Sequence, residues 1–214
     1  MFFLVRLFLM KKFDVYLFDF DGTLVDSRDS LEMVFKGAYG AVGVEVDSDY
    51  IIRLMRIPLQ QGYKELDGPM DRIDLFCSEI IRLLDDKEVL KKTKPYPDVL
   101  ESLNRLHKEG KVLGIVTSNN ARHVKDVLNF LGIDKDLFKI IVGNEETKRH
   151  KPYPDPVLKG LELLEEKPDR VCYVGDGLDD MTSASIAGVT PVLLDRRNEY
   201  KDEPYITIKT LKEL

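Results

Sequence analysis

The feature that most constrains the fold is a repeated pair of patterns, in which a short, uninterrupted apolar run precedes a segment with helical apolar spacing. The apolar runs lie at Val15–Phe18, Val112–Val116 and Val171–Val174. Strands that are buried on both faces show such continuous runs, whereas strands with one wet face alternate. The order of strand and helix therefore predicts an α/β fold, with a doubly wound parallel sheet and right-handed crossovers.

Helical spacing fills the stretches between these runs. Apolar residues recur every three or four positions over 99–106 and 124–131, and a glycine suited to a helix end follows each, Gly110 and Gly132. A further helix is expected to begin at Pro156, because proline is favoured in the first turn.

Residues 27–94 depart from this alternation, because they contain no strand-like run. Their apolar spacing is helical over 31–42, 59–66 and 73–84. We therefore predict an all-helical cap domain at 27–94, inserted into a Rossmann-like core domain of residues 10–26 and 95–214. The prolines of Lys94-Pro95-Tyr96-Pro97 stiffen a short connector, as a hinged lid would need. Residues 1–9 are expected to be an extension or an added strand, with Met10 as a natural start.

Composition limits the kinds of molecule that the chain is expected to bind. The 214 residues suit a core domain with a smaller insertion, and 38 acidic against 32 basic residues give a net charge of −6. This charge disfavours binding to nucleic acid or to an anionic membrane. The apolar start is interrupted by Arg6 and is shorter than the roughly 20 residues that a membrane span needs. Two cysteines without CxxC spacing fit a reducing cytoplasm. The modest size and the lack of a targeting signal favour a monomer.

Two acids, Asp19 and Asp21, come directly after the first strand-like run. In open α/β sheets the functional crevice lies outside the carboxyl ends of the strands. Gly22 and Thr23 suit a tight turn with free backbone amides, which bind phosphate oxygens. An isolated D-x-D-G would be more simply explained as a turn, but the full string FDFDGTLVDS is much more specific.

This string resembles the first motif of the haloacid dehalogenase superfamily, especially of its branch of phosphoglycolate phosphatases and β-phosphoglucomutase-like proteins. Thr117 in IVTSN resembles the second motif, Lys151 in KPYPDP the third, and Asp176 in GDGLDD the fourth. The segment TPVLLD resembles the last core strand of the family. The resemblance thus covers nearly the whole chain.

The matched residues also make physical sense together. Asp19, Asp21, Thr117 and Asp176 all follow predicted parallel strands, so a doubly wound sheet would bring them to one edge. Clustered carboxylates repel each other unless a hard cation with oxygen ligands balances them, and octahedral Mg²⁺ fits best. Lys151 would supply a compact positive charge for phosphate. Thr117 and the Ser118 amide would add neutral donors.

The resemblance implies a mechanism. Asp19 attacks phosphorus and forms an aspartyl-phosphate, while Asp21 protonates the leaving oxygen and then activates water. Mg²⁺ would be held by Asp19, by the backbone carbonyl of Asp21 and by Asp176. Asp180 would order metal-bound water or the Lys151 ammonium.

Other residues are assigned less directly. We interpret Arg53, Arg56 and Asn119 as possible substrate contacts, although the two arginines also suit a solvated helix face. Asp26 and Ser27 are expected to cap the first helix of the insertion.

Several functions remain open at this point. The chain is predicted to be a phosphatase that hydrolyses a small phosphorylated metabolite, similar to phosphoglycolate or a sugar phosphate. A sugar-phosphate mutase would share every motif, and a pyrophosphatase or a catalytically silent binding module are further alternatives. A dehalogenase would not need Asp21, and a phosphonatase would need a Schiff-base lysine, whereas Lys36 and Lys64 lie in no recognisable motif.

Overall fold

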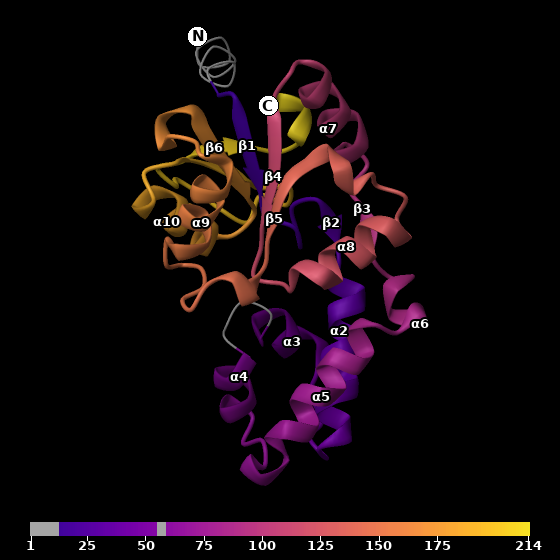
Figure 1. Cartoon of the computed structure of the whole chain (residues 1–214). Coiled ribbons are helices and arrows are strands. Elements are labelled where there is room, and N and C mark those ends of the chain that lie inside the picture. The colour runs from indigo at the N-terminus through magenta and orange to yellow at the C-terminus, as the bar shows by residue number, and fades with distance from the viewer. Residues whose placement is uncertain (1–12, 55–58) are drawn as a thin grey trace. The chain divides into compact units, whose positions relative to one another are not determined.

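A computed structural model describes residues 13–54 and 59–214. The chain divides into two units (Figure 1). Each unit has a hydrophobic core of its own. The core unit comprises Met1–Val25 and Pro95–Leu214, and the helical unit comprises Asp26–Lys94. Two short strands, β2 (Val25–Asp26) and β3 (Lys94–Pro95), pair where the chain passes between the units. The predictions made for residues 1–9 and Met10 fall outside the described residues.

The core unit is built on a six-stranded sheet in the order β5-β4-β1-β6-β7-β8, and every neighbouring pair is parallel. The strands are β1 (Val15–Phe18), β4 (Val112–Val116), β5 (Phe138–Val142), β6 (Val171–Gly175), β7 (Thr190–Leu194) and β8 (Ile206–Ile208). The first strand, β1, lies in the interior of the sheet; the chain then winds outward through β4 and β5, and returns to add β6, β7 and β8 on the other side of β1. The predicted doubly wound α/β fold is therefore confirmed.

The edge strands were not all predicted. β5 has exposed Lys139 within it and is only partly buried, so it lacks the continuous apolar run of a central strand. By contrast, every residue of β1 and β6 is buried. A continuous apolar run therefore marks the strands in the middle of the sheet, where burial is greatest, and fails to mark β5.

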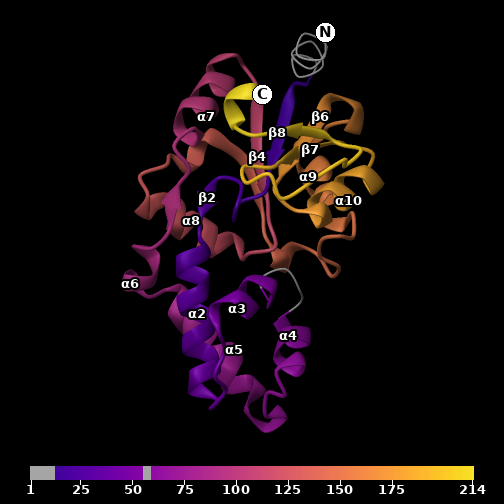
Figure 2. The same ribbon diagram turned by 180° about the vertical axis from the view of Figure 1, so that it is seen from behind.

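Helices cover both faces of this sheet. In Figures 1 and 2, α7 (Val99–Lys108) and α8 (Ala121–Phe130) lie on one face, whereas α9 (Asp155–Leu164) and α10 (Leu178–Ile186) lie on the other. The end of α7 is followed by Gly110 in the left-handed region, at φ 76°, as a glycine helix stop requires. Short 3₁₀ turns lie at Lys135–Leu137, Asn144–Glu146, Pro168–Arg170 and Leu211–Glu213.

The register of the central strands sets where the site forms. β1 lies between β4 and β6, and Phe18 pairs with Ile115 on one side and with Val174 on the other. The residues that follow these three strands must therefore emerge together at the carboxyl edge of the sheet. This is also where the winding direction reverses, which is the usual place for a ligand in such folds.

The helical unit contains α2 (Arg28–Ala41), α3 (Ser48–Leu54), α4 (Leu59–Glu65), α5 (Ile73–Leu84), α6 (Lys87–Leu90) and a 3₁₀ turn at Met70–Arg72. The expected helices over 31–42, 59–66 and 73–84 are present as α2, α4 and α5. Its core includes a cluster of aromatic side chains, in which the rings of Tyr39 and Tyr63 each lie 4.6 Å from that of Phe76, centroid to centroid.

The expected cap of α2 is wrong for Ser27. Ser27 occupies the N-cap position, but its side chain makes no capping hydrogen bond. Its backbone carbonyl instead accepts the Ser30 hydroxyl at 2.7 Å. Asp26 accepts the Arg28 amide only at 3.4 Å. At the start of α2, the Asp26 side chain therefore accepts a backbone amide, whereas that of Ser27 does not.

None of the helices in the two described stretches of chain has the length and apolar character needed to cross a membrane.

Candidate active site

Three strand ends deliver functional side chains to the carboxyl edge of the sheet. Asp19 follows β1, Thr117 follows β4, and Asp176 follows β6. The Asp19 amide donates to the Val174 carbonyl at 2.9 Å, and the Thr117 amide donates to the Val142 carbonyl at 3.0 Å. These bonds extend the backbone ladder past the strands, so Asp19 and Thr117 are fixed by the sheet itself.

The turn after Asp19 needs Gly22. This residue has φ 84°, a left-handed conformation that disfavours other residues. A β-carbon built on Gly22 would also overlap the Asp176 carboxylate. Thr23 reaches the same carboxylate, with its hydroxyl 3.4 Å from Asp176 Oδ1. The turn therefore brings the segment after Asp19 into direct contact with Asp176, which lies 157 residues later in the chain.

Lys151 stands between two carboxylates. Its Nζ lies 2.6 Å from Asp19 Oδ1 and 2.6 Å from Asp180 Oδ1, and only 6% of its side chain is exposed. The second oxygen of Asp180 accepts the Gly177 amide at 3.0 Å, which fixes this carboxylate at the start of α10. The structure thus joins Asp19, Lys151 and Asp180 in one buried ion-pair network.

Burial and charge oppose each other in this network. Burial raises the pKa of Asp19 well above its usual value, and the neighbouring Asp180 and Asp176 raise it further, against the effect of Lys151. Burial alone would lower the pKa of Lys151, but Asp180 and Asp19 outweigh it and raise that pKa well above the ordinary value. Lys151 is therefore held as an ammonium. Its one positive charge is not enough to balance the neighbouring carboxylates.

The acids could bind a metal ion. One carboxylate oxygen from each of Asp19, Asp176 and Asp180 lies within 4.8 Å of the others. Lys151 pairs with two of these three carboxylates, those of Asp19 and Asp180, so ionisation of all three leaves an excess of negative charge. Hard oxygen ligands in this number suit a divalent cation. The sequence assigned Asp180 to the surroundings of the metal, and the structure adds it to the cluster of possible ligands.

Asp21 is in contact with Asn119, which was expected to touch substrate. The Asn119 amide nitrogen Nδ2 donates to Asp21 Oδ2 at 3.2 Å. The Asn120 amide donates to the Asn119 side-chain oxygen at 2.8 Å, and this bond turns Nδ2 toward Asp21. Ser118 is exposed beside Thr117. The first and second motifs therefore meet through a hydrogen bond between Asp21 and Asn119.

The two arginines proposed as substrate contacts belong to the helical unit. The guanidinium of Arg53 lies 3.3 Å from Glu65 Oε2 and 5.6 Å from the centre of the Tyr50 ring. These contacts are those of a solvated helix face. Arg56 lies outside the described residues.

Sequence reasoning missed two residues that shape the site. Glu145 accepts the Ala121 amide with both carboxylate oxygens, at 3.0 and 3.3 Å, and so caps the start of α8 just after the second motif. Tyr173 contacts Lys151 from β6, with its phenol oxygen 3.1 Å from Nζ. No sequence motif marked either residue, and Tyr173 read only as part of an apolar run.

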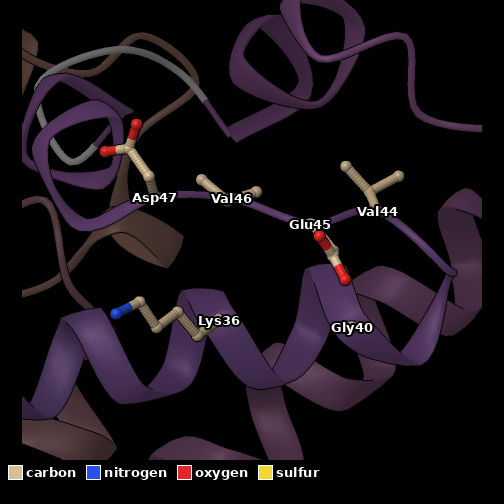
Figure 3. A pocket seen from close by; sticks show the side chains of 6 residues that line it. All are labelled: Lys36, Gly40, Val44, Glu45, Val46 and Asp47. Carbon is tan, nitrogen blue, oxygen red and sulfur yellow. The ribbon is translucent and has the colours of Figure 1, made fainter.

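A separate hollow lies within the helical unit. In Figure 3, Glu45 points from the extended segment 44–47 toward Gly40 on α2, while Val44 and Val46 point to the other side of that segment. Lys36 also lines this hollow, and its Nζ donates to Glu32 and to the Ser48 hydroxyl, each at 2.7 Å. These surface contacts resemble ordinary salt bridges and give Lys36 no sign of a Schiff-base role.

The parallel sheet and the buried acid–lysine network are those of an α/β protein with a charged site at the switch point of its sheet. The family model of haloacid dehalogenase-like hydrolases matches residues 16–194. The chain belongs to the haloacid dehalogenase-like hydrolase family.

Two relatives illustrate this membership. A protein of Caldanaerobacter subterraneus subsp. tengcongensis, named as a candidate pyrophosphatase PpaX, is 34% identical over 85% of this chain and 81% of its own length. The phosphoglycolate phosphatase of Aquifex aeolicus is 31% identical over 84% of this chain and 83% of its own length.

A solved structure agrees with these relatives. A candidate haloacid dehalogenase-like hydrolase from Bacteroides fragilis is 30% identical and superposes with a TM-score of 0.83, over 94% of this chain and 99% of its own. The prediction that the chain is a phosphatase of this family is confirmed.

Proposed function

We propose that the chain is a Mg²⁺-dependent phosphatase that hydrolyses a small phosphorylated metabolite through an aspartyl-phosphate on Asp19. The observation that carries this proposal is the cluster of the Asp19, Asp176 and Asp180 carboxylates, two of which pair with Lys151. Such a centre combines a nucleophilic carboxylate with positive charge for the phosphoryl oxygens, which are the two needs of phosphoryl transfer.

The donor set supports a magnesium ion. Asp19 and Asp176 would hold it together with the backbone carbonyl of Asp21, and Asp180 would act through Lys151. Each of these donors is a hard oxygen, as Mg²⁺ prefers. When bound, the ion would supply charge stabilisation for the phosphoryl group and balance the crowded carboxylates. The raised pKa of Asp19 supports this requirement, because a nucleophile must be ionised.

The remaining steps belong to the residues of the chain. One oxygen of Asp19 attacks phosphorus, and the bond to the leaving oxygen breaks as Asp21 gives that oxygen a proton. Asp21 then takes a proton from the water that hydrolyses the aspartyl-phosphate. Lys151 places its positive charge beside the phosphoryl group on Asp19, and the Thr117 hydroxyl donates to the phosphoryl oxygens. The Asn119 contact favours a fixed position for the Asp21 carboxylate during both steps.

The substrate is proposed at the level of a chemical class. Similarity to the phosphoglycolate phosphatase of Aquifex aeolicus supports a small phosphomonoester. Similarity to the protein named as a candidate PpaX supports inorganic pyrophosphate as a second candidate. A sugar-phosphate mutase would share the same catalytic residues and differ in how water is excluded. Cytoplasmic location and a monomeric state stay predictions.

The test is phosphate release from a panel that includes phosphoglycolate, pyrophosphate and sugar monophosphates, with and without Mg²⁺. We expect release from at least one phosphorylated substrate in the wild type, and loss of turnover in Asp19→Asn. The melting temperature of both proteins controls for folding. Absence of metal-dependent release from every substrate would contradict the phosphatase proposal, and interconversion of sugar phosphates without release would select the mutase.

A further inference from the structure

We propose that Tyr173 is a positioning residue for Lys151, and that its phenol oxygen directs the lysine ammonium toward Asp19. The inference rests on the proposed function, which gives Lys151 the task of binding the phosphoryl group. It concerns a residue outside the four motifs.

Tyr173 lies in the middle of β6 and is completely buried. Its ring belongs to the apolar cluster in which β1, β4 and β6 pack against α9 and α10. Its oxygen is the polar end of an otherwise apolar side chain. That oxygen lies 2.6 Å from the Val116 carbonyl and 3.1 Å from Lys151 Nζ.

The distances fix which way the hydroxyl points. A phenol carries one proton, and two acceptor oxygens cannot lie 2.6 Å apart without a proton between them. The proton of Tyr173 therefore belongs to the Val116 carbonyl. The contact with Asp180 Oδ1 is longer, at 3.4 Å, and does not compete. A lone pair of the phenol oxygen is left facing Lys151.

Each proton of the Lys151 ammonium then has an acceptor. It has three protons, and three acceptors surround it: Asp19 Oδ1 and Asp180 Oδ1 at 2.6 Å, and the Tyr173 oxygen at 3.1 Å. With each proton assigned, rotation of the ammonium would break a charge-assisted hydrogen bond in a buried place, which is costly. Tyr173 thus supplies the neutral acceptor that keeps the ammonium in one orientation.

The same hydroxyl links two parts of the site. Val116 is the last residue of β4, immediately before Thr117, so the bond from Tyr173 ties the lysine to the strand end that carries the second motif. Lys151 itself comes from a loop rather than from the sheet. Side chains from loops need such a second layer of contacts if they are to hold a charge within a fraction of an ångström.

The test is Tyr173→Phe, with Tyr16→Phe as the matched control. Tyr16 is also a buried tyrosine of this sheet, but its ring packs against Phe13 and Phe18 rather than against the site. We would titrate each protein with orthovanadate in the presence of Mg²⁺ and follow the heat released. We expect the vanadate Kd of Tyr173→Phe to rise about 10-fold at unchanged stoichiometry, and that of Tyr16→Phe to stay within about twofold.

Stoichiometry separates positioning from folding. A merely structural role would lower the fraction of binding-competent protein and leave the Kd of the remainder unchanged. In a Lys151→Gln background we expect no additional effect of Tyr173→Phe, because the hydroxyl acts through the lysine. An unchanged Kd in Tyr173→Phe, or an equal rise in the Lys151→Gln background, would overturn the inference.

A spectroscopic measurement covers the possibility that Lys151→Gln does not fold. NMR of the lysine ammonium groups, with ¹⁵N-labelled lysine, reports directly on the hydrogen bonds of Lys151. We expect a slowly exchanging ammonium signal in the wild type that shifts or broadens in Tyr173→Phe but not in Tyr16→Phe. An unshifted signal would contradict the contact. If the wild type binds no vanadate and shows no Mg²⁺-dependent hydrolysis, the proposed function fails instead.

Discussion

The two units of the chain differ in whether they bury ion pairs. In the core unit, the side chains of Asp19, Lys151 and Asp180 are less than 10% exposed and pair across 29 or more residues of sequence. In the helical unit, ion pairs such as Lys36–Glu32 and Arg82–Glu79 lie on the surface, within one turn of a helix.

The difference follows from what buried charge costs. Moving ions out of water is unfavourable, so a fold retains a buried ion network mainly where a task requires it. The helical unit instead builds an apolar core, and among its described residues no charged side chain is buried. We therefore expect substitutions in the acid–lysine network of the core unit to change chemistry, and those in the helical unit to change stability or substrate preference.

The largest effect is expected when a carboxylate is removed from the core unit. Asp176→Asn should lower kcat/KM by about 100-fold or more and raise the Mg²⁺ concentration needed for half-maximal rate, because an amide is a weaker ligand than a carboxylate. Steady-state kinetics over a Mg²⁺ series would measure both. Asp74→Asn, an exposed acid in the first turn of α5, is the matched control. Equal losses of kcat/KM in the two variants would contradict the expectation that chemistry depends on the acids of the core unit.

The second expected effect concerns stability of the helical unit. Phe76 is fully buried between Tyr39 and Tyr63, so Phe76→Ala leaves a cavity and should lower the free energy of unfolding by about 3–5 kcal/mol. Urea unfolding followed by circular dichroism would measure this. The adjacent Leu75 is 45% exposed, and Leu75→Ala should cost far less. Similar costs for both variants would show that the aromatic cluster does not stabilise the unit.

The contrast between the units also explains what the sequence could predict. Asp19, Thr117 and Asp176 follow buried strands, and parallel strands leave their carboxyl ends at one edge whatever else the fold does. The contact between Asn119 and Asp21, by contrast, depends on the path of a loop, and Tyr173 looks apolar in sequence. The short helices α3 and α6 were missed because few turns give little periodicity, and their formation depends on tertiary packing.

A smaller effect tests a buried charge of the core unit away from the acid cluster. Asp98 Oδ2 accepts Arg196 Nη1 at 2.9 Å, the Thr210 hydroxyl at 2.6 Å and the Leu211 amide at 2.7 Å. Burial would raise the pKa of Asp98, but these donors outweigh it and hold the pKa below its usual value. Asp98→Asn should therefore lower the free energy of unfolding at pH 7 by about 2 kcal/mol.

The contribution of Asp98 to the free energy of unfolding should depend on pH. A carboxyl whose pKa is lowered by folding stabilises the fold above its unfolded pKa of about 4, and the contribution is lost as the pH falls through the folded value. In urea unfolding, the difference between wild type and Asp98→Asn should thus begin to shrink below about pH 4 and should vanish only as the pH passes below the folded pKa. Asp126→Asn, which removes an exposed acid paired with Arg122, is the control. A difference that persists undiminished in acid would show that charge is not its cause.

The smallest effect is expected at Arg53 of the helical unit. Its side chain is 66% exposed and pairs with Glu65, so Arg53→Gln should change the free energy of unfolding by less than about 0.5 kcal/mol. Glu65→Gln breaks the same pair and should match it. If Arg53 only serves this surface pair, both variants keep the wild-type KM for the preferred substrate of the panel. A rise in KM confined to Arg53→Gln would instead assign the arginine to the substrate, because only that variant removes a cation which an anionic group could bind.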